Sequence, residues 1–276
     1  MLGVISAGGK KPAVPRKSRN LARFLTGTSG WNYGEWQGRF YPEDLPARKW
    51  LSYYAERFGT VEVNYSFYHL PRETTYANWY AQTSPEFVFA LKASRFITHI
   101  KRLRDVEQAW KEFVRRALEL KEKLGPILLQ FPPSFHASPE NLELMEDFLS
   151  YAVTRRSPRI AMEFRHQSCF EEKVLALLRR YRTALVVAHS RRYPIAPVIA
   201  TSDLAYFRFH GPRELFASSY SDAELREWAV HMGSLLGKGC DVYAYFNNDA
   251  GGYAVSNAKT LARIMESAGM SGGGGS

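Results

Sequence analysis

The sequence predicts an α/β protein built as a (β/α)8 TIM-like barrel in which the sixth helix is short or irregular. Eight short apolar runs recur along the chain at a spacing close to the roughly 30 residues of a strand–helix unit. Amphipathic segments that begin with helix-capping residues separate most of these runs. No glycine-rich nucleotide fingerprint follows any run, which disfavours a doubly wound open sheet as the competing architecture.

The composition supports a globular protein. The chain has 276 residues, 45% hydrophobic and 23% charged, and a formal net charge of +10, which excludes a wholly disordered chain. Two cysteines, Cys169 and Cys240, exclude a disulfide scaffold and a cysteine-rich zinc module. No apolar run approaches the ~18 residues of a membrane span. We therefore expect a cytoplasmic protein with no membrane partner.

The two ends differ in composition from the predicted domain, which covers residues 23–270. Residues 1–22 contain five lysines and arginines and no acidic residue, and no apolar segment follows that would make them a signal peptide. This segment is expected to be a flexible basic tail, either solvated or serving as a nucleic-acid-binding arm. Residues 271–276 resemble a flexible Gly/Ser linker or an appended tail.

The eight apolar runs are predicted as the barrel strands, since each is short and the stretches between them carry helical patterns. They span residues 24–28, 60–64, 87–92, 126–131, 159–164, 184–188, 205–209 and 241–246.

The segments between the strands are mostly predicted helices. Residues 47–58 and 72–82 form the first two. Asp105 with Gln108 makes a capping-box pattern for a third helix, which Gly125-Pro126 is expected to end. The N-terminal signals of the next helices are Ser138 before Pro139, Ser168 with Glu171, and Ser221 with Glu224.

The sixth and eighth units complete the pattern. Residues 190–202 contain Pro194 and Pro197 and show no helical period, so the sixth strand is expected to lack a regular helix after it. Ser256 is predicted to open the last helix, which ends near Gly269.

Polar residues at the carboxyl ends of these strands mark a candidate site, because active sites of this fold lie at that end of the barrel. The two-residue period of a strand assigns alternate side chains to the lumen and to the helices. This period directs the following side chains inward: Glu62, Asn64, Lys92, Gln130, Glu163, Arg165, Leu185, Val187, His189, Tyr206, Arg208, His210, Tyr243, Tyr245, Asn247 and Asp249.

The charges among these residues suggest the ligand. Lys92, Arg165 and Arg208 outnumber Glu62 and Glu163, which gives 3 − 2 = +1 before His210 and Asp249 are counted. A slightly positive, aromatic-lined pocket favours a small anionic or polyhydroxy ligand, such as a phosphate or a carboxylate. The alternative is a structural network of ion pairs, Glu62 with Lys92 and Glu163 with Arg208, because buried charges are costly unless paired.

Several phrases at these strand ends make the chain similar to the YecE-like barrel family, a widespread domain of unknown function. The resemblance runs in order through about residues 24–265 and implies a (β/α)8-like barrel, but no reaction. The phrases are Gly27-Thr28-Ser29-Gly30-Trp31 with Tyr33 and Trp36, Phe40-Tyr41-Pro42, Thr60-Val61-Glu62-Val63-Asn64 with Phe67-Tyr68, Lys92 with Ile97-Thr98-His99, Gln130-Phe131-Pro132-Pro133, Glu163-Phe164-Arg165-His166, Arg208-Phe209-His210-Gly211 and Tyr245-Phe246-Asn247-Asn248-Asp249.

Two positions depart from the pattern of that family. His189 stands where relatives usually have an acidic residue after the sixth strand. Cys169 stands where an aromatic residue, often Trp, follows the Arg-His phrase. If the acidic residue is a ligand or a base, the resemblance implies a changed or lost activity, or His189 as a replacement metal ligand.

Metal-free acid–base catalysis is the leading hypothesis, and no cofactor is expected. The catalytic candidates are Glu62, Glu163, Lys92 and His210, with Glu62 as the acid and Glu163 kept ionised by Arg165. An imine formed by Lys92 is a minor option, since a neighbouring Glu62 would keep the lysine charged. The candidate ligand-binding residues are Trp31, Tyr33, Asn64, Gln130, Arg165, His166, Arg208, Asn247, Asn248 and Asp249.

Three other classes of function remain open. A metal-dependent hydrolase or isomerase would draw its ligands from Glu62, Glu163, His189, His210 and Asp249. A nucleic-acid-binding or processing protein would use the basic segments and would stack bases on aromatic side chains. A non-enzymatic ligand-binding barrel is the third. The aromatic candidates for base stacking are Trp31, Tyr33, Trp36, Phe40 and Tyr41.

Overall fold

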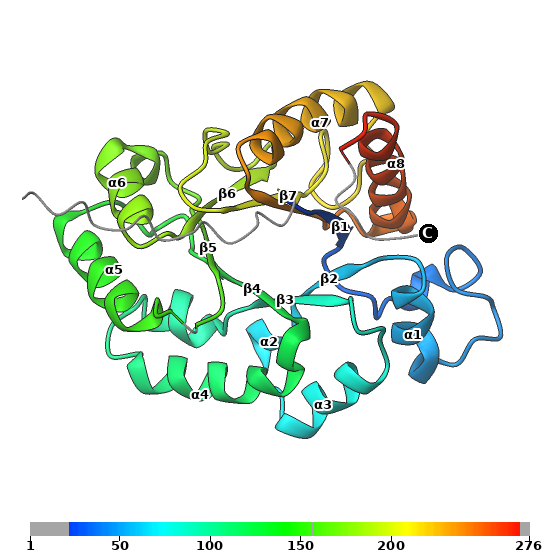
Figure 1. Ribbon diagram of the computed structural model, residues 1–276, viewed down its shortest axis with the longest axis horizontal. Helices are drawn as coiled ribbons and strands as arrows, with labels where there is room; N and C mark the ends of the chain where they lie inside the picture. The colour runs from blue at the N-terminus through cyan, green and yellow to red at the C-terminus, as the bar shows by residue number, and fades with distance from the viewer. Residues whose placement is uncertain (1–21, 156, 271–276) are drawn as a thin grey trace, which may run out of the picture.

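The computed structural model describes residues 22–155 and 157–270 of the chain. The expected basic tail, apart from Ala22, and the Gly/Ser segment therefore lie outside the described residues. Helices surround a central set of parallel strands (Figure 1). The strands are β1 (Phe24–Thr28), β2 (Thr60–Val63), β3 (Val88–Lys92), β4 (Leu124–Gln130), β5 (Ile160–Glu163), β6 (Ala184–His189), β7 (Leu204–Phe209) and β8 (Asp241–Phe246).

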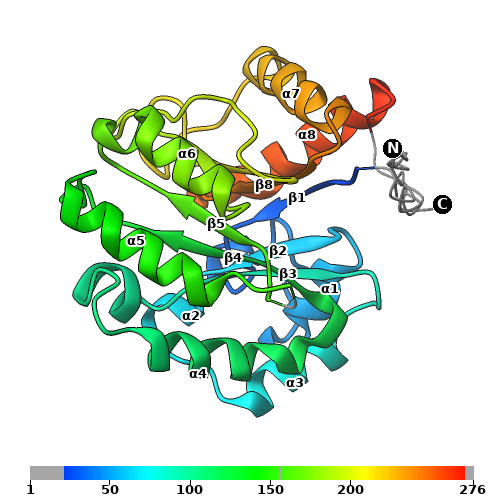
Figure 2. The ribbon, with the colours of Figure 1, turned by 60° about the vertical axis from the view of Figure 1, so that its left-hand side comes forward.

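The helices follow the strands in sequence and cover the outside of the barrel (Figure 2). The longer helices are α1 (Trp50–Ala55), α2 (Tyr65–Tyr68), α3 (Glu73–Ala81), α4 (Glu107–Ala117), α5 (Pro139–Ala152), α6 (Glu172–Arg180), α7 (Asp222–Gly237) and α8 (Tyr253–Ser267). The short turns are η1 (Gly34–Trp36), η2 (Ala47–Lys49), the π-helical η3 (Phe96–Ile100), η4 (Leu118–Lys123), η5 (Gln167–Phe170) and η6 (Ala250–Gly252).

The sheet is parallel throughout, in the order β1-β8-β7-β6-β5-β4-β3-β2, and curls into a nearly closed barrel, which confirms the predicted fold class. The ends of this order meet between β1 and β2. There the Tyr54 hydroxyl joins the strands, 2.9 Å from the Thr28 nitrogen and 3.1 Å from the Thr60 carbonyl oxygen. Gly27 permits this close approach, since a Cβ atom at that position would lie 2.3 Å from the Thr60 oxygen.

Two apolar clusters fill the protein, one between strands and helices and one inside the barrel. The inner cluster includes Ala90, Val186, Tyr206, Tyr243 and Tyr245. The predicted inward direction of the tyrosines is therefore confirmed. The prediction was wrong for β6, because Leu185 and Val187 belong to the outer cluster.

The helix-start signals had mixed outcomes. Ser138 caps α5 ahead of Pro139, and Ser221 with Glu224 forms a complete capping box on α7, as predicted. The capping box at Asp105 was wrong, since α4 begins at Glu107 with no side-chain cap and Asp105 adopts a φ of 50°. The segment that follows the sixth strand forms no helix, as the sequence indicated.

Three other predicted boundaries moved. The Ser168–Glu171 box was wrong, because the Ser168 hydroxyl accepts from the Ala137 nitrogen and α6 has no side-chain cap. Gly125 lies inside β4 instead of ending a helix, and α8 starts at Tyr253, before Ser256. Within the described residues, no helix combines the length and the apolarity needed to cross a membrane.

Candidate active site at the mouth of the barrel

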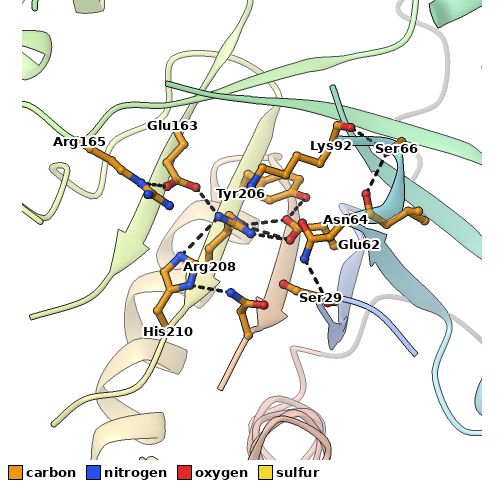
Figure 3. Close-up of polar contacts among 12 residues, drawn as sticks. Ser29, Glu62, Asn64, Ser66, Lys92, Glu163, Arg165, Tyr206, Arg208 and His210 are labelled. Atoms are coloured by element: carbon orange, nitrogen blue, oxygen red, sulfur yellow. Dashed lines mark hydrogen bonds and ion pairs between the residues drawn. The ribbon is translucent and has the colours of Figure 1, made fainter. Parts of the chain in front are cut away.

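Four strands bring charged side chains to one place at the carboxyl end of the barrel. Glu62 comes from β2, Lys92 from β3, Glu163 from β5 and Arg208 from β7. Figure 3 shows the Arg208 guanidinium between the two carboxylates. The convergence inferred from the alternation along each strand is therefore present.

Arg208 is the centre of a buried ion-pair network. Its Nε lies 2.9 Å from Oε2 of Glu62 and its Nη2 lies 2.7 Å from Oε1, which makes this contact bidentate. Its Nη1 lies 2.6 Å from Oε2 of Glu163. The Tyr206 hydroxyl donates to Glu62 at 2.7 Å, and the Nε of Arg165 donates to Glu163 at 3.0 Å (Figure 3).

These contacts keep Glu163 and Arg208 charged although both side chains are almost fully buried. Glu62 is 0% exposed and Arg208 is 1% exposed. Burial alone would raise the pKa of Glu163, but Arg208 and Arg165 outweigh it and hold that pKa well below its ordinary value. Burial opposes the charge of Arg208, yet the two glutamates raise its pKa further above the usual range.

The network differs from the predicted pairing in one partner. Glu163 pairs with Arg208 as expected, but the expected Glu62–Lys92 pair was wrong, since Arg208 occupies both oxygens of Glu62. Both carboxylates are thus engaged in holding an arginine. Their assignment as acid and base stays a prediction that requires one of these contacts to open.

Lys92 stands apart from this network. Its Nζ lies 4.0 Å from the centre of the Phe67 ring, and its backbone oxygen accepts from the Ser66 hydroxyl at 2.7 Å. The ion pairs that the structure shows at the mouth all use arginine nitrogens. Burial, together with the nearby Arg208, lowers the pKa of Lys92 to about 7.

His210 lies beside the network at the end of β7. Its Nε2 is 3.4 Å from Nη1 of Arg208, and its Nδ1 is 3.1 Å from the Asn247 amide nitrogen (Figure 3). Burial and the charge of Arg208 lower the pKa of His210 well below its ordinary value. The imidazole is therefore neutral near pH 7.

A cavity of about 530 Å³ opens above these residues. Its wall includes the cations Lys92, Arg95, Arg165 and Arg208, and no aspartate or glutamate. Glu62 and Glu163 lie beneath Arg208, outside the lining. The remaining lining residues are Tyr33, Asn64, Phe67, Tyr68, His99, Gln130, His210, Phe216 and Asn247.

A second cavity of about 540 Å³ adjoins the first, and Tyr33 and Asn64 line both. Its wall contains Trp31, whose ring packs edge-on against Trp79 with centroids 5.3 Å apart. The predicted ligand-binding residue Trp31 thus belongs to this aromatic cavity and is absent from the lining of the charged one.

Among the residues that the structure describes, buried side-chain oxygens without partners occur on Asn64, which lines both cavities, on Ser29, which lines the aromatic one, and on Asp249, which lines neither. Within the described residues, Oδ1 of Asn64, Oγ of Ser29 and Oδ1 of Asp249 are buried and form no hydrogen bond. Asn64 donates to the Ser29 carbonyl oxygen at 3.1 Å, and Tyr33 donates to the same oxygen at 2.7 Å. Burial raises the pKa of Asp249 to about 7. Such unsatisfied groups indicate donors still to be supplied.

Two predicted site residues point elsewhere, and a third lines the charged cavity. His166 bonds Ser168 at 2.9 Å and stacks on His136, so it is absent from both cavity linings. Asn248 donates to the oxygen of the Asn257 side chain at 2.9 Å, which ties β8 to α8. Gln130 lines the charged cavity, with its amide nitrogen 2.7 Å from the Phe131 oxygen.

The two departures from the family pattern lie outside the charged cavity. The predicted inward direction of His189 was wrong, because its Nδ1 lies 2.8 Å from the Tyr220 hydroxyl and its ring packs on Trp228 of α7. Cys169 is buried with its sulfur 3.4 Å from the Phe135 oxygen. In the part of the chain that the structure describes, no three His, Cys, Asp or Glu residues are grouped to hold a metal ion.

The proposed base-stacking surface is mostly interior. Trp36 is 0% and Tyr41 1% exposed, and both pack with Phe40 in one buried aromatic group. Only Trp31 and Tyr33 of that set reach a cavity.

Sequence reasoning missed several residues of the charged wall. Arg95 and His99 belong to the segment around η3, and Phe67 and Tyr68 belong to α2. All four follow directly after a strand, at the end where barrel sites form. That position in the chain was the available signal.

The comparisons with known proteins agree with the fold and with the family resemblance. The family model "Protein of unknown function DUF72" matches residues 25–272. The Bacillus subtilis protein YunF is 25% identical over 272 residues, covering 87% of this chain and 94% of that protein. Escherichia coli YecE is 32% identical over 116 residues, which are 40% of this chain and 42% of that protein.

Solved structures give the same result. A DUF72 family protein from Thermotoga maritima superimposes with a TM-score of 0.79 at 30% identity, over 88% of this chain and 99% of that one. A DUF72 family protein from Enterococcus faecalis, at 19% identity, shares the fold with a TM-score of 0.76, over 88% of this chain and 95% of that one. The chain therefore belongs to the DUF72 family of proteins of unknown function.

Proposed function

We propose that the mouth of the barrel binds a small hydroxylated anion and acts on it by acid–base chemistry. The observation that carries this proposal is the charged cavity, whose wall has four cationic side chains and no carboxylate. Because Glu62 and Glu163 pair with Arg208 and Arg165, Arg95 and the protonated fraction of Lys92 contribute charge that no carboxylate of the wall offsets. A phosphate or carboxylate group supplies the missing negative charge.

The hydroxyl groups of the ligand are assigned to the junction of the two cavities. Asn64, which lines both cavities, and Ser29, which lines the aromatic one, each have a buried side-chain oxygen with no partner among the described residues. A hydroxyl that enters beside Tyr33 would satisfy these oxygens after a small side-chain rotation, and burial makes each such bond worth about 1–3 kcal/mol. Lys92, with a pKa of about 7, is the residue best suited to exchange protons with the ligand near neutral pH.

Binding of glycerol 3-phosphate, measured by calorimetry at low salt, tests this proposal. We expect it to bind while glycerol does not, and we expect Arg95→Met to weaken binding about tenfold, the loss of ~1.4 kcal/mol typical of a charge-assisted contact. Arg95 suits the test because its side chain is exposed and no ion pair of the described residues depends on it.

Lys111→Met is the matched control, since Lys111 is an exposed lysine on α4 that lines neither cavity. Equal affinity for glycerol and glycerol 3-phosphate, or equal losses in the two variants, would overturn the assignment of the anion to this cavity.

A further inference from the structure

The side chain of Lys92 is nearly buried and yet reaches the wall of the charged cavity, a position that suits a nucleophilic amine. The residue ends β3, and its side chain runs toward Arg208 while its backbone oxygen is held by Ser66 (Figure 3). The side chain is only 9% exposed, yet it forms part of the wall of the charged cavity. The side chain therefore lines the cavity from a mostly desolvated position.

The carboxylates that would hold this amine in its charged form bind arginines instead, which leaves the face of the Phe67 ring, 4.0 Å from Nζ, as its contact that favours the ammonium. Sequence reasoning disfavoured covalent chemistry at Lys92 because Glu62 would stabilise the ammonium. In the structure both oxygens of Glu62 bind Arg208, and Tyr206 also donates to this carboxylate. Glu163 is bound by Arg208 and Arg165. With a pKa of about 7, roughly half of Lys92 is the free amine at neutral pH.

We propose that Lys92 forms an imine with the carbonyl carbon of a hydroxylated anion bound in the charged cavity. This inference rests on the function proposed above and names its substrate class: an open-chain aldehyde or ketone that carries a phosphate or carboxylate group. Arg95, on the same wall, faces the anionic group, and the Asn64 side of the cavity faces the hydroxyls.

The chemistry balances without an oxidant or a cofactor. The lone pair of Nζ adds to the carbonyl carbon, and the oxygen takes a proton to give a carbinolamine. The C–O bond then breaks, a C=N bond forms, and the oxygen leaves as water with the two protons that the amine gives up. Desolvation of the wall favours the addition step, since the uncharged amine is the attacking species.

Reductive trapping tests the proposal on the full-length protein. The protein is incubated at pH 7 with limiting D-glyceraldehyde 3-phosphate and cyanoborohydride, and modified lysines are located by peptide mass spectrometry. We expect Lys92 to be modified at least about tenfold faster than any other lysine, because an ordinary lysine with a pKa of ~10.4 has far less free amine at this pH. Glycerol 3-phosphate, which lacks the carbonyl, should slow the modification.

The outcomes separate this proposal from the one on which it rests. Modification spread over exposed lysines such as Lys111 with Lys92 spared, or no modification at all, overturns the imine. If glycerol 3-phosphate still binds in that case, anion binding stands alone. If it neither binds nor protects, both proposals fall. Because the mapping uses the wild-type protein, the result does not depend on how well a Lys92→Met variant folds.

Discussion

Arg208 binds Glu62 through two nitrogens at once, with Nε 2.9 Å from Oε2 and Nη2 2.7 Å from Oε1. This contact joins β7 to β2 across the barrel, and the Nη1 contact with Glu163 adds β5. A buried arginine between two carboxylates fixes the mouth in one arrangement, because each partner left alone would be a buried, unpaired charge. Arg208, which also lines the charged cavity, therefore belongs both to this network and to the candidate ligand site.

Arg208→Met should destabilise the protein by about 3–5 kcal/mol, since it leaves Glu62 buried without its cation and Glu163 with Arg165 alone. Urea unfolding followed by circular dichroism measures this change. The triple variant Arg208→Met, Glu62→Gln, Glu163→Gln also removes the carboxylate charges. It should recover much of the unfolding free energy that the single variant loses. An Arg208→Met variant as stable as the wild type would show that the network contributes little to the free energy of unfolding.

Acid should destabilise the protein through Glu163. Arg208 and Arg165 hold its pKa in the folded protein below the ~4.3 of an unfolded glutamate. The unfolded chain thus binds the proton first, so this stability is complete above that value and is lost as the pH falls toward the lower pKa of the folded state.

The difference in unfolding free energy between wild type and Glu163→Gln, followed from pH 6 to pH 2, measures the acid effect. It should shrink as the pH falls. Glu140→Gln serves as the control, because Glu140 is exposed and pairs only at the surface with Arg104. If the unfolding free energies of the wild type and Glu163→Gln fell in parallel as the pH is lowered, the expectation would be contradicted.

The sequence predicted the site well where polar and apolar residues alternate along a strand. Glu62 lies between Val61 and Val63, and Arg208 lies between two phenylalanines, so only one orientation buries the apolar side chains. The sixth strand is apolar at five successive positions, 184–188, so its period gives no direction. Pairing with β7 decides it: Val186 aligns with the inward-facing Tyr206, which turns His189 outward.

The partner of each charge could not be predicted in the same way. Alternation sends Lys92 and Arg208 into the same lumen, but it does not say which of them reaches Glu62. The fork of the guanidinium matches a carboxylate in two places, and a lysine ammonium cannot do so. That geometric advantage left Lys92 free to line the cavity, which is the property on which the proposed chemistry depends.

Gly27→Ala should weaken the junction between β1 and β2. The added methyl group would lie 2.3 Å from the Thr60 oxygen and 2.8 Å from the Tyr54 hydroxyl, so the backbone of β2 must move. Overpacking of this kind costs about 1–3 kcal/mol in unfolding free energy. Gly34→Ala is the matched control, because nothing lies within 4 Å of its Cβ position. Equal stabilities of the two variants would show that the junction accommodates the added methyl group without a cost in unfolding free energy.

Alkaline conditions should stabilise the protein through Lys92. Its pKa is about 7 in the folded protein and ~10.4 in an unfolded chain, so between these values the unfolded chain binds the extra proton. Unfolding free energy therefore rises from pH 7 to pH 10 by an amount on the order of a few kcal/mol. Lys92→Met removes this contribution and should flatten the curve relative to wild type, whereas Lys111→Met, an exposed lysine, should leave it unchanged. A Lys92→Met curve that keeps the wild-type slope would mean that the amine stays charged in the folded protein, and such an amine could not act as the nucleophile proposed for the cavity.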